Sequence, residues 1–176
     1  MAVARRAPRR PSQRRRESGH LRYTVDASVF VNAFNPHEKG HAESLAVLAK
    51  IQERGDPVIV PTLLLPEIAS AVARASDDNA GALQYANATA GLPHLTLVTV
   101  SPTLARQAAE LAATRRLRGA VALYVAVARR YGTTLVSLDE EQRSRGSAVV
   151  ACQTPEETIS SRSYGARRRK IGPSPG

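Results

Sequence analysis

The 176 residues of this chain suffice for one domain with a hydrophobic core, and 43% of them are hydrophobic although Trp is absent. The single cysteine excludes an intramolecular disulfide and a zinc cluster of cysteines, and it favours a reducing compartment. No apolar run approaches the roughly 20 residues that span a bilayer, so we expect a cytoplasmic protein that does not bind a membrane.

The net charge of +10 comes from the two ends of the chain. Residues 1–22 contain eight Arg and one Glu, a balance of +7, and residues 161–176 contain four Arg and one Lys, a balance of +5. The segment between them has 12 basic and 14 acidic residues, a balance of −2. We expect 1–22 and 161–176 to be disordered and either to bind nucleic acid or to be merely solvated, and we expect a flexible basic C-terminal tail at 153–176. Residues 1–22 could also lie upstream of the true translation start.

Strand and helix patterns alternate between these tails. Helix signals are clearest at Ser101-Pro102, an N-cap followed by Pro at the first helical position, and at Gly55, which stops a helix. In chain order we expect a strand at 23–25, helices at 27–34 and 37–54, a strand at 57–60, helices at 62–75 and 80–90, a strand at 95–98, helices at 102–114 and 119–131, a strand at 134–138, a helix at 140–145 and a strand at 148–150. This alternation predicts an α/β fold with a parallel sheet covered on both faces.

Three acidic residues fall where ligands bind in such a sheet, beyond the carboxyl ends of the strands. Asp26 follows the first strand, Asp139 follows the fourth, and Glu67 lies early in the helix after the second strand. The helix at 119–131 leads into the fourth strand, so its beginning lies at the same edge. Chain order alone therefore brings the three acids and the start of this helix together.

The chemistry of these acids predicts a metal centre. Three carboxylates repel one another unless a cation lies between them, and oxygen ligands without His or Cys select Mg²⁺ or Mn²⁺ over zinc. Each acid taken alone also has a structural interpretation. Asp26 and Asp139 could cap the helices that follow them, and Glu67 could be a solvated helix residue. Their shared placement favours the metal centre, and Arg118, with Arg115 and Arg116, either binds substrate phosphates there or complements a helix end.

Four sequence blocks resemble the successive motifs of PIN domains, above all those of VapC-type toxins of toxin–antitoxin pairs. The resemblance covers about residues 22–152, and the blocks occur in the family's order and spacing. They are Thr24-Val25-Asp26-Ala27-Ser28-Val29-Phe30-Val31, Pro61 followed by Pro66-Glu67-Ile68, Leu117-Arg118-Gly119-Ala120-Val121-Ala122-Leu123-Tyr124-Val125-Ala126-Val127-Ala128, and Thr134-Leu135-Val136-Ser137-Leu138-Asp139.

The resemblance implies a PIN-like domain at 23–152, built as a three-layer α/β/α sandwich around a mainly parallel sheet. It implies an RNA endonuclease that depends on Mg²⁺ or Mn²⁺, a homodimer, and an antitoxin that blocks the site. Asp26, Glu67 and Asp139 match the family's catalytic and metal-binding acids. Ser28 matches a small polar residue beside the site, which we assign to substrate binding together with Arg118.

The sequence departs from the PIN pattern at Val121, where the family's third block has Asp after Gly-Ala. In the full pattern four carboxylates hold one or two metal ions, which orient water and lower its pKa. Val cannot coordinate a metal, so we expect weaker metal binding, with the second ion of a two-ion site affected most. Glu140 or Glu141 could reach in instead, although they lie on the helix that leaves the site.

Three hypotheses follow from this departure. The chain could be an RNA endonuclease of reduced activity, a PIN-like module that binds RNA or an antitoxin without cleavage, or a normal toxin in which Val121 is an engineered or sporadic change. A phosphotransfer protein with its acceptor at Asp26 is disfavoured, because no second Asp follows two residues later.

Overall fold

The computed structural model describes residues 21–161, in which a five-stranded sheet is surrounded by helices. The strands are β1 (Tyr23–Val25), β2 (Val58–Pro61), β3 (Leu95–Val98), β4 (Thr134–Val136) and β5 (Cys152–Gln153). The helices are α1 (Ala27–Phe34), α2 (His41–Arg54), α3 (Leu64–Ser76), α4 (Asn79–Ala90), α5 (Pro102–Arg115), α6 (Gly119–Tyr131), α7 (Glu140–Gly146) and α8 (Pro155–Ser160).

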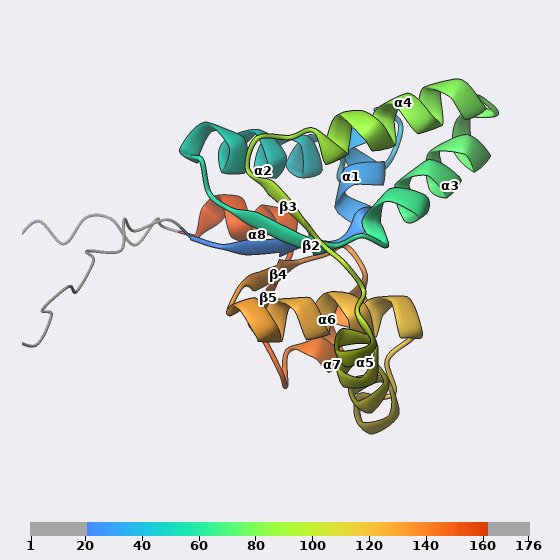
Figure 1. Ribbon diagram of the computed structural model, residues 1–176. Helices are drawn as coiled ribbons and strands as arrows, with labels where there is room; N and C mark the ends of the chain where they lie inside the picture. The colour runs from blue at the N-terminus through green and yellow to red at the C-terminus, as the bar shows by residue number, and fades with distance from the viewer. Residues whose placement is uncertain (1–20, 162–176) are drawn as a thin grey trace, which may run out of the picture.

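The sheet has the strand order β3-β2-β1-β4-β5, and every neighbouring pair is parallel. Helices α1 to α4 lie on one side of the sheet, and α5, α6 and α7 lie on the other (Figure 1). The predicted α/β/α sandwich with a parallel sheet is therefore confirmed. Because all strands run the same way, their carboxyl ends share one edge, and the helices that follow β1, β2 and β4 begin there.

Local signals set the ends of the helices. Asp26 and Ser101 cap α1 and α5 with their side chains, as such residues do at N-caps. Gly55 and Gly132 end α2 and α6 with φ values of 66° and 62°, a left-handed conformation that costs glycine little. Gly40, with φ 85°, marks the start of α2. The predicted helix at 37–54 therefore began too early, because residues 37–40 form turns.

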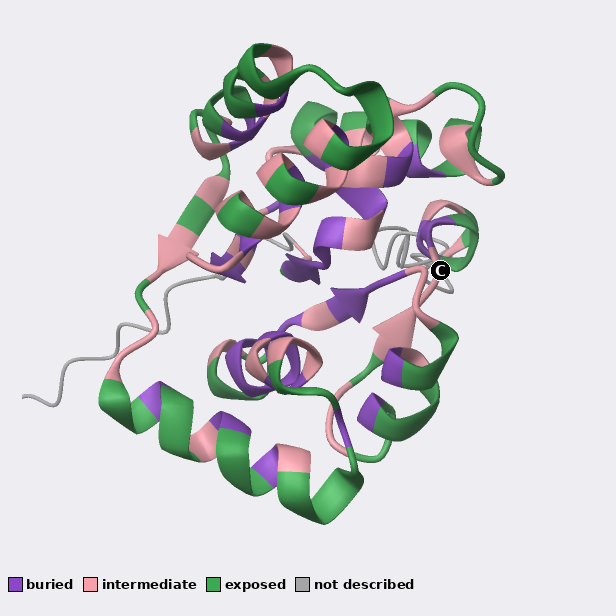
Figure 2. Ribbon diagram, turned by 90° about the vertical axis from the view of Figure 1, so that its right-hand side faces the viewer, coloured by how far each residue is buried: buried purple, intermediate pink, exposed green. Residues whose placement is uncertain are grey.

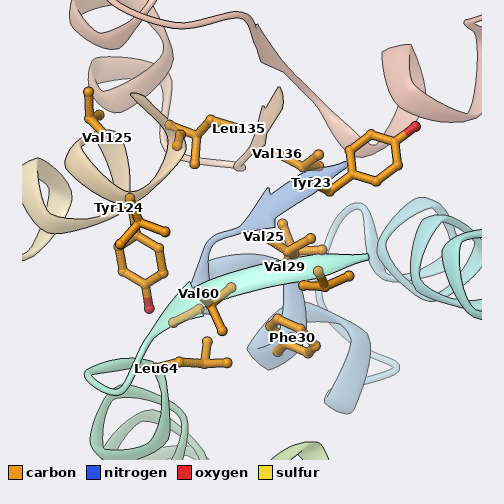
Figure 3. Packing of buried hydrophobic residues seen from close by; sticks show 14 of the residues in the cluster. Tyr23, Val25, Val29, Phe30, Val60, Leu64, Tyr124, Val125, Leu135 and Val136 are labelled. Carbon is orange, nitrogen blue, oxygen red and sulfur yellow. The ribbon is translucent and has the colours of Figure 1, made fainter. Parts of the chain in front are cut away.

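The core lies between the sheet and the inner faces of the helices. Figure 2 shows buried residues along the sheet and on the helix sides turned toward it, with exposed residues on the outer sides. Helix α6 is the most enclosed, because Ala122 and residues 124–128 are all buried in it. Figure 3 shows the Tyr124 ring extending from α6 past Val60 toward the start of α3 at Leu64. The Tyr124 side chain thereby reaches from α6 to the helix that carries Glu67.

The end of the sheet differs from the expected strands at 134–138 and 148–150. The fifth strand is Cys152–Gln153, because the amides of Val149 and Val150 donate back to the carbonyl of Gly146 and close a turn after α7. The fourth strand ends at Val136, since the amide of Leu138 donates to the Ser28 hydroxyl, 3.2 Å away, and not to another strand.

The predicted flexible tail at 153–176 is wrong in its first part. Thr154 and Glu157 form a reciprocal capping box, which starts α8 at Pro155. The helix packs against α2, where the ammonium of Lys50 donates to the carbonyl of Ile159. The rest of this tail, 162–176, and most of the expected N-terminal tail, residues 1–20, lie outside the described residues. No helix between residues 21 and 161 has the length and apolar character to span a bilayer.

Candidate active site

The three predicted acids border one pocket of about 400 Å³ at the carboxyl edge of the sheet. Asp26 comes from the end of β1, Glu67 from the first turn of α3, and Asp139 from the residue before α7. The remaining lining residues come from α1, α3, α6 and α7 and are Ala27, Ser28, Val31, Ser70, Ala71, Arg74, Arg118, Ala120, Val121, Tyr124 and Gln142. Parallel strands and the helix starts beside them thus bring the acids together, as chain order predicts.

Asp26 is buried at the floor of this pocket and is held by hydroxyl groups. Its Oδ2 accepts from the hydroxyls of Ser28 and Ser137 at 2.5 and 3.1 Å, and from the Ser28 amide at 3.3 Å. Burial raises the pKa of Asp26, and these hydrogen bonds oppose the rise only in part. The carboxylate therefore has hydrogen-bond donors around it, yet its negative charge is uncompensated.

Glu67 is half-buried and has a single strong partner. The hydroxyl of Tyr124, a buried residue in the middle of α6, donates to Glu67 Oε2 at 2.6 Å. Burial raises the pKa of Glu67, the Tyr124 hydrogen bond lowers it, and the negative charge of Asp26 raises it further. The negative charges of Glu67 and Asp26 therefore repel each other across the pocket.

Asp139 is in a different environment from the other two acids. Its Oδ1 accepts from the Gln142 amide at 2.9 Å and caps α7, and its Oδ2 forms an ion pair with the guanidinium of Arg118. The Asp139 side chain is 23% exposed and the Arg118 side chain 66% exposed. The expected helix-capping role of Asp139 is therefore present together with its place in the pocket.

Val121 lies on α6 one turn after Arg118 and lines the same pocket, half-buried against the core. Its side chain adds an apolar wall where the PIN pattern has a fourth carboxylate. Glu140 and Glu141 do not line the pocket. Glu141 is instead paired with Arg145 at 2.6 Å and lies 3.9 Å from Arg118.

The carboxylate oxygens of the pocket are suitable ligands for a divalent ion, but the three acids are not all positioned to bind one ion together. Within residues 21–161, no group of three or more His, Cys, Asp or Glu side chains is placed to hold a metal ion. Mg²⁺, however, is usually bound through one or two carboxylates and completes its shell with water and substrate phosphates. The Asp26 and Glu67 pair meets this requirement, whereas both oxygens of Asp139 already have partners. Metal binding by all three acids stays a prediction.

Several pocket residues were absent from the sequence-based prediction. Tyr124 lies in an apolar segment of the sequence that gives no sign of a polar role, and only the fold shows that its hydroxyl reaches Glu67. Ser70 and Arg74 follow Glu67 at helical spacings of three and seven residues, a signal that places them on the same face of α3. The spacing of Arg74 could have been recognised, but the Tyr124 contact depends on the packing of α6 against α3.

A small polar network supports Asp26 from the side of α7. The Ser137 hydroxyl lies 3.1 Å from Asp26 Oδ2 and 2.7 Å from Gln142 Oε1, and it accepts from the Asp139 amide at 3.0 Å. One hydroxyl has a single proton, and the buried Gln142 Nε2 has no partner among the described residues. Turning the Gln142 amide over lets its NH₂ donate to Ser137, which then donates to Asp26. Gln142 and Ser137 thereby orient the carboxylate of Asp26.

The predicted basic residues are distributed unequally. Arg118 borders the pocket, whereas Arg115 and Arg116 are exposed and do not line it. The Arg116 carbonyl accepts a hydrogen bond from Arg145, which ties the end of α5 to α7. Of the three arginines proposed from the sequence to contact phosphates, only Arg118 is at the site.

Comparisons with known proteins give a consistent result. A family model described as the PIN domain matches residues 23–147. The structure of VapC20 from Mycobacterium tuberculosis, a sarcin–ricin loop-cleaving toxin, is similar with a TM-score of 0.61 and 20% identity, over 70% of this chain and 95% of that chain. VapBC2 from Rickettsia felis, bound to promoter DNA, gives 0.59 and 14% identity, over 76% and 98%. FitAcB from Neisseria gonorrhoeae gives 0.54 and 18%, over 76% and 98%. No curated protein sequence gives a significant match.

Proposed function

Because this chain belongs to the PIN domain family, we propose that it is a metal-dependent RNA endonuclease of a toxin–antitoxin pair, with activity reduced by Val121. The proposal rests on one observation: Asp26 and Glu67 face one pocket with raised pKa values and without an ion-pair partner among residues 21–161. Two partly buried anions that are close enough to repel each other favour a bound cation. Mg²⁺ or Mn²⁺ suits their oxygen ligands.

In the proposed site, Asp26 and Glu67 hold the divalent ion, which when bound activates water and neutralises charge on the phosphate. Ser28 and Ser137 keep Asp26 in place, and Tyr124 keeps Glu67 in place. Arg118, exposed at the mouth of the pocket, binds a phosphate of the RNA backbone. Asp139 either joins as a third ligand or remains paired with Arg118.

A second candidate function is an RNA- or antitoxin-binding module that does not cleave. The state of Asp139 favours it, because both carboxylate oxygens have partners and Val121 supplies no ligand in compensation. In this case the pocket keeps its shape and its phosphate-binding arginine, while metal binding is too weak to support hydrolysis.

The partners proposed for the chain are RNA, an antitoxin protein and a second copy of itself. Structural neighbours include toxin–antitoxin complexes and an RNA-cleaving toxin, which supports the first two. The homodimer rests on the resemblance to VapC-type toxins. Co-expression with a cognate antitoxin should increase the yield of the chain, since it would suppress any residual cleavage in the host.

An RNA cleavage assay that compares the wild-type chain with Val121→Asp tests the proposal. With excess Mg²⁺, we expect slow cleavage by the wild type, about tenfold faster cleavage by Val121→Asp, and none in EDTA, because a restored ligand strengthens metal binding. Val121→Ala serves as the control, since it shortens the same side chain without adding a carboxylate.

Each outcome of this assay decides between the candidates. Gain of cleavage by Val121→Asp alone supports a nuclease site that is weakened at one ligand. Inactivity of both proteins, with RNA binding retained, supports the non-cleaving module. Equal activity of the wild type and Val121→Asp means that position 121 does not contribute a ligand in this chain.

A further inference from the structure

Two basic residues, Arg74 and Arg118, line the acidic pocket, and of these only Arg118 forms an ion pair within residues 21–161. Arg118 is the residue before α6, where its backbone is extended. Its side chain makes no capping bond to the helix and can therefore extend toward the pocket. Its guanidinium is paired with Asp139 and lies 3.9 Å from Glu141. Glu141 in turn binds Arg145, whose guanidinium donates to the carbonyl of Arg116. The arginine is therefore held at the edge of the site by a chain of contacts from α7.

This pairing sets Arg118 in competition with a metal ion. Asp139 Oδ1 accepts from the Gln142 amide and Oδ2 from Arg118, so an ion that binds Asp139 must come close to the positive charge of the guanidinium or displace it. Val121, one turn along α6, adds no second carboxylate beside Asp139 that could attract another ion.

The same guanidinium is suited to bind phosphate without leaving Asp139. A guanidinium has five N–H donors, and only its Nη2 donates to Asp139. Its other N–H groups make no hydrogen bond within residues 21–161, although Nε lies 3.9 Å from Glu141 Oε2, and 66% of the side chain is exposed. An exposed ion pair contributes little to stability, so a phosphate can also draw the arginine partly away from Asp139 at small cost.

We propose that Arg118 is the resident cation of this site, which neutralises Asp139 and binds an RNA phosphate in place of a second divalent ion. The inference deepens the proposed function and rests on it, because it assigns the metal to Asp26 and Glu67 and the arginine to the opposite wall. Val121 fits this arrangement, since a fourth carboxylate beside Arg118 would pair with the guanidinium and withdraw it from phosphate. The positive charges in the site are then one metal ion and one arginine, whereas the four carboxylates of the full PIN pattern hold one or two metal ions.

Two binding measurements on Arg118→Ala test this inference, and they are expected to move in opposite directions. Mn²⁺ binding, followed by the electron paramagnetic resonance of the free ion, should become about threefold tighter, because a competing positive charge is removed. Binding of a short single-stranded RNA in EDTA, followed by fluorescence anisotropy, should weaken about threefold or more. The slope of its affinity against salt concentration should fall by about one phosphate contact.

The controls separate this role from a general effect of charge or folding. Arg129→Ala removes an exposed positive charge from the last turn of the same helix, at the opposite edge of the sheet, and should change neither measurement. In an Asp139→Asn background, Arg118→Ala should no longer tighten Mn²⁺ binding, because the charge for which arginine and metal compete has gone. Damage to the fold would weaken both kinds of binding and cannot produce tighter Mn²⁺ binding.

Each result bears on the inference separately from the proposed function. If the wild type binds Mn²⁺ and Arg118→Ala binds it equally or more weakly, the inference is overturned and the nuclease proposal stands. If RNA affinity in EDTA is unchanged in Arg118→Ala, the phosphate role is overturned. If neither the wild type nor any variant binds Mn²⁺, the proposed metal-dependent function is wrong. The proposed competition between Arg118 and a metal ion is then wrong as well.

Discussion

The two walls of the acidic pocket handle negative charge in different ways. On the wall formed by β1 and α3, Asp26 and Glu67 accept hydrogen bonds from uncharged groups, and burial raises the pKa of each. Arg74 of α3 also lines this wall but forms no ion pair with either acid in the described residues. On the wall formed by α6 and α7, the charge of Asp139 is neutralised by Arg118, and Val121 is uncharged. The first wall therefore retains uncompensated charge, whereas the second is already neutral.

The difference shows which wall can bind a cation. Hydroxyl groups orient a carboxylate without compensating its charge, so the wall with Asp26 and Glu67 keeps its attraction for a metal ion. A guanidinium removes that attraction but brings its own attraction for phosphate. A single pocket can thus hold the metal on one wall and the RNA backbone on the other. The loss of the fourth acid makes the walls unequal without closing the pocket.

Among substitutions that test the difference between the two walls, Glu67→Gln should have the largest effect on metal binding and cleavage. The change keeps the size of the side chain and its hydrogen bond with Tyr124, but it removes one of the two charges on the metal-binding wall. We expect Mn²⁺ affinity and RNA cleavage to fall by about 100-fold or more, as loss of a metal ligand should exceed the roughly 10–100-fold cost of losing an outer contact. Isothermal titration with Mn²⁺ and a cleavage assay measure the two effects.

Glu110→Gln on the exposed surface of α5 is the matched control for Glu67→Gln, and it should leave both quantities unchanged. RNA binding in EDTA should not weaken in Glu67→Gln, because phosphate contact belongs to the other wall. Mn²⁺ affinity that survives the Glu67 substitution would show that the two walls do not differ in the proposed way.

Tyr124→Phe should have a smaller effect on the same wall. It removes only the hydroxyl that donates to Glu67 Oε2 at 2.6 Å, and the ring keeps its place in the core. We expect Mn²⁺ affinity to fall by about tenfold, since outer partners of metal ligands typically contribute 10–100-fold. Tyr85→Phe is the control, because its hydroxyl donates at 2.7 Å to the Phe30 carbonyl, outside the pocket.

The result for Tyr124→Phe tests whether the hydroxyl positions Glu67 or only fills the core. A packing role alone would lower thermal stability and leave Mn²⁺ affinity at the wild-type value. Restored Mn²⁺ affinity on adding Glu67→Asp to Tyr124→Phe would also oppose the positioning role. A carboxylate would then bind the ion well although no hydroxyl orients it.

The sequence predicted the acids of the pocket better than the contacts among them. Asp26 and Asp139 could be placed because they end buried strands, and parallel strands end at one edge of the sheet. The helix expected at 119–131 has the observed bounds, since a long apolar segment that ends at Gly132 is a strong local signal. The pairing of Arg118 with Asp139 joins residues 21 positions apart in the chain, and only the packing of α7 beside α6 determines it.

The errors in the fold concern short elements near the C-terminus. Strand β5 has two residues, and its position depends on the bond from the Leu135 amide to the Ala151 carbonyl at 2.8 Å. Its neighbours Val149 and Val150 have the stronger strand propensity but lie in the preceding turn. Helix α8 had a readable signal in Thr154 and Glu157, but six residues are too few to show an apolar period.

The smallest expected effect is one of stability, and it comes from Asp26→Asn in the absence of metal. Burial raises the folded-state pKa of Asp26, so at neutral pH its charge opposes folding. The contribution of Asp26 to stability is therefore greatest below about pH 4 and falls as pH rises through the raised pKa. Asn also caps helices well and keeps the bonds to Ser28, so Asp26→Asn should raise Tm at pH 7 in EDTA by about 2–4 °C, or roughly 1 kcal/mol.

The pH and metal dependence of this Tm difference connects stability with function. The gain from Asp26→Asn should shrink as the pH is lowered through the raised pKa of the folded state to below about 4, where the wild-type carboxyl group is protonated in the folded and unfolded states alike. Saturating Mg²⁺ should raise the Tm of the wild type and leave that of Asp26→Asn nearly unchanged, since only the wild type keeps both charges on the metal-binding wall. A lower Tm for Asp26→Asn at pH 7 in EDTA would mean that hydrogen bonds outweigh the buried charge. The wall with Asp26 and Glu67 would then be no more dependent on a cation than the wall with Arg118.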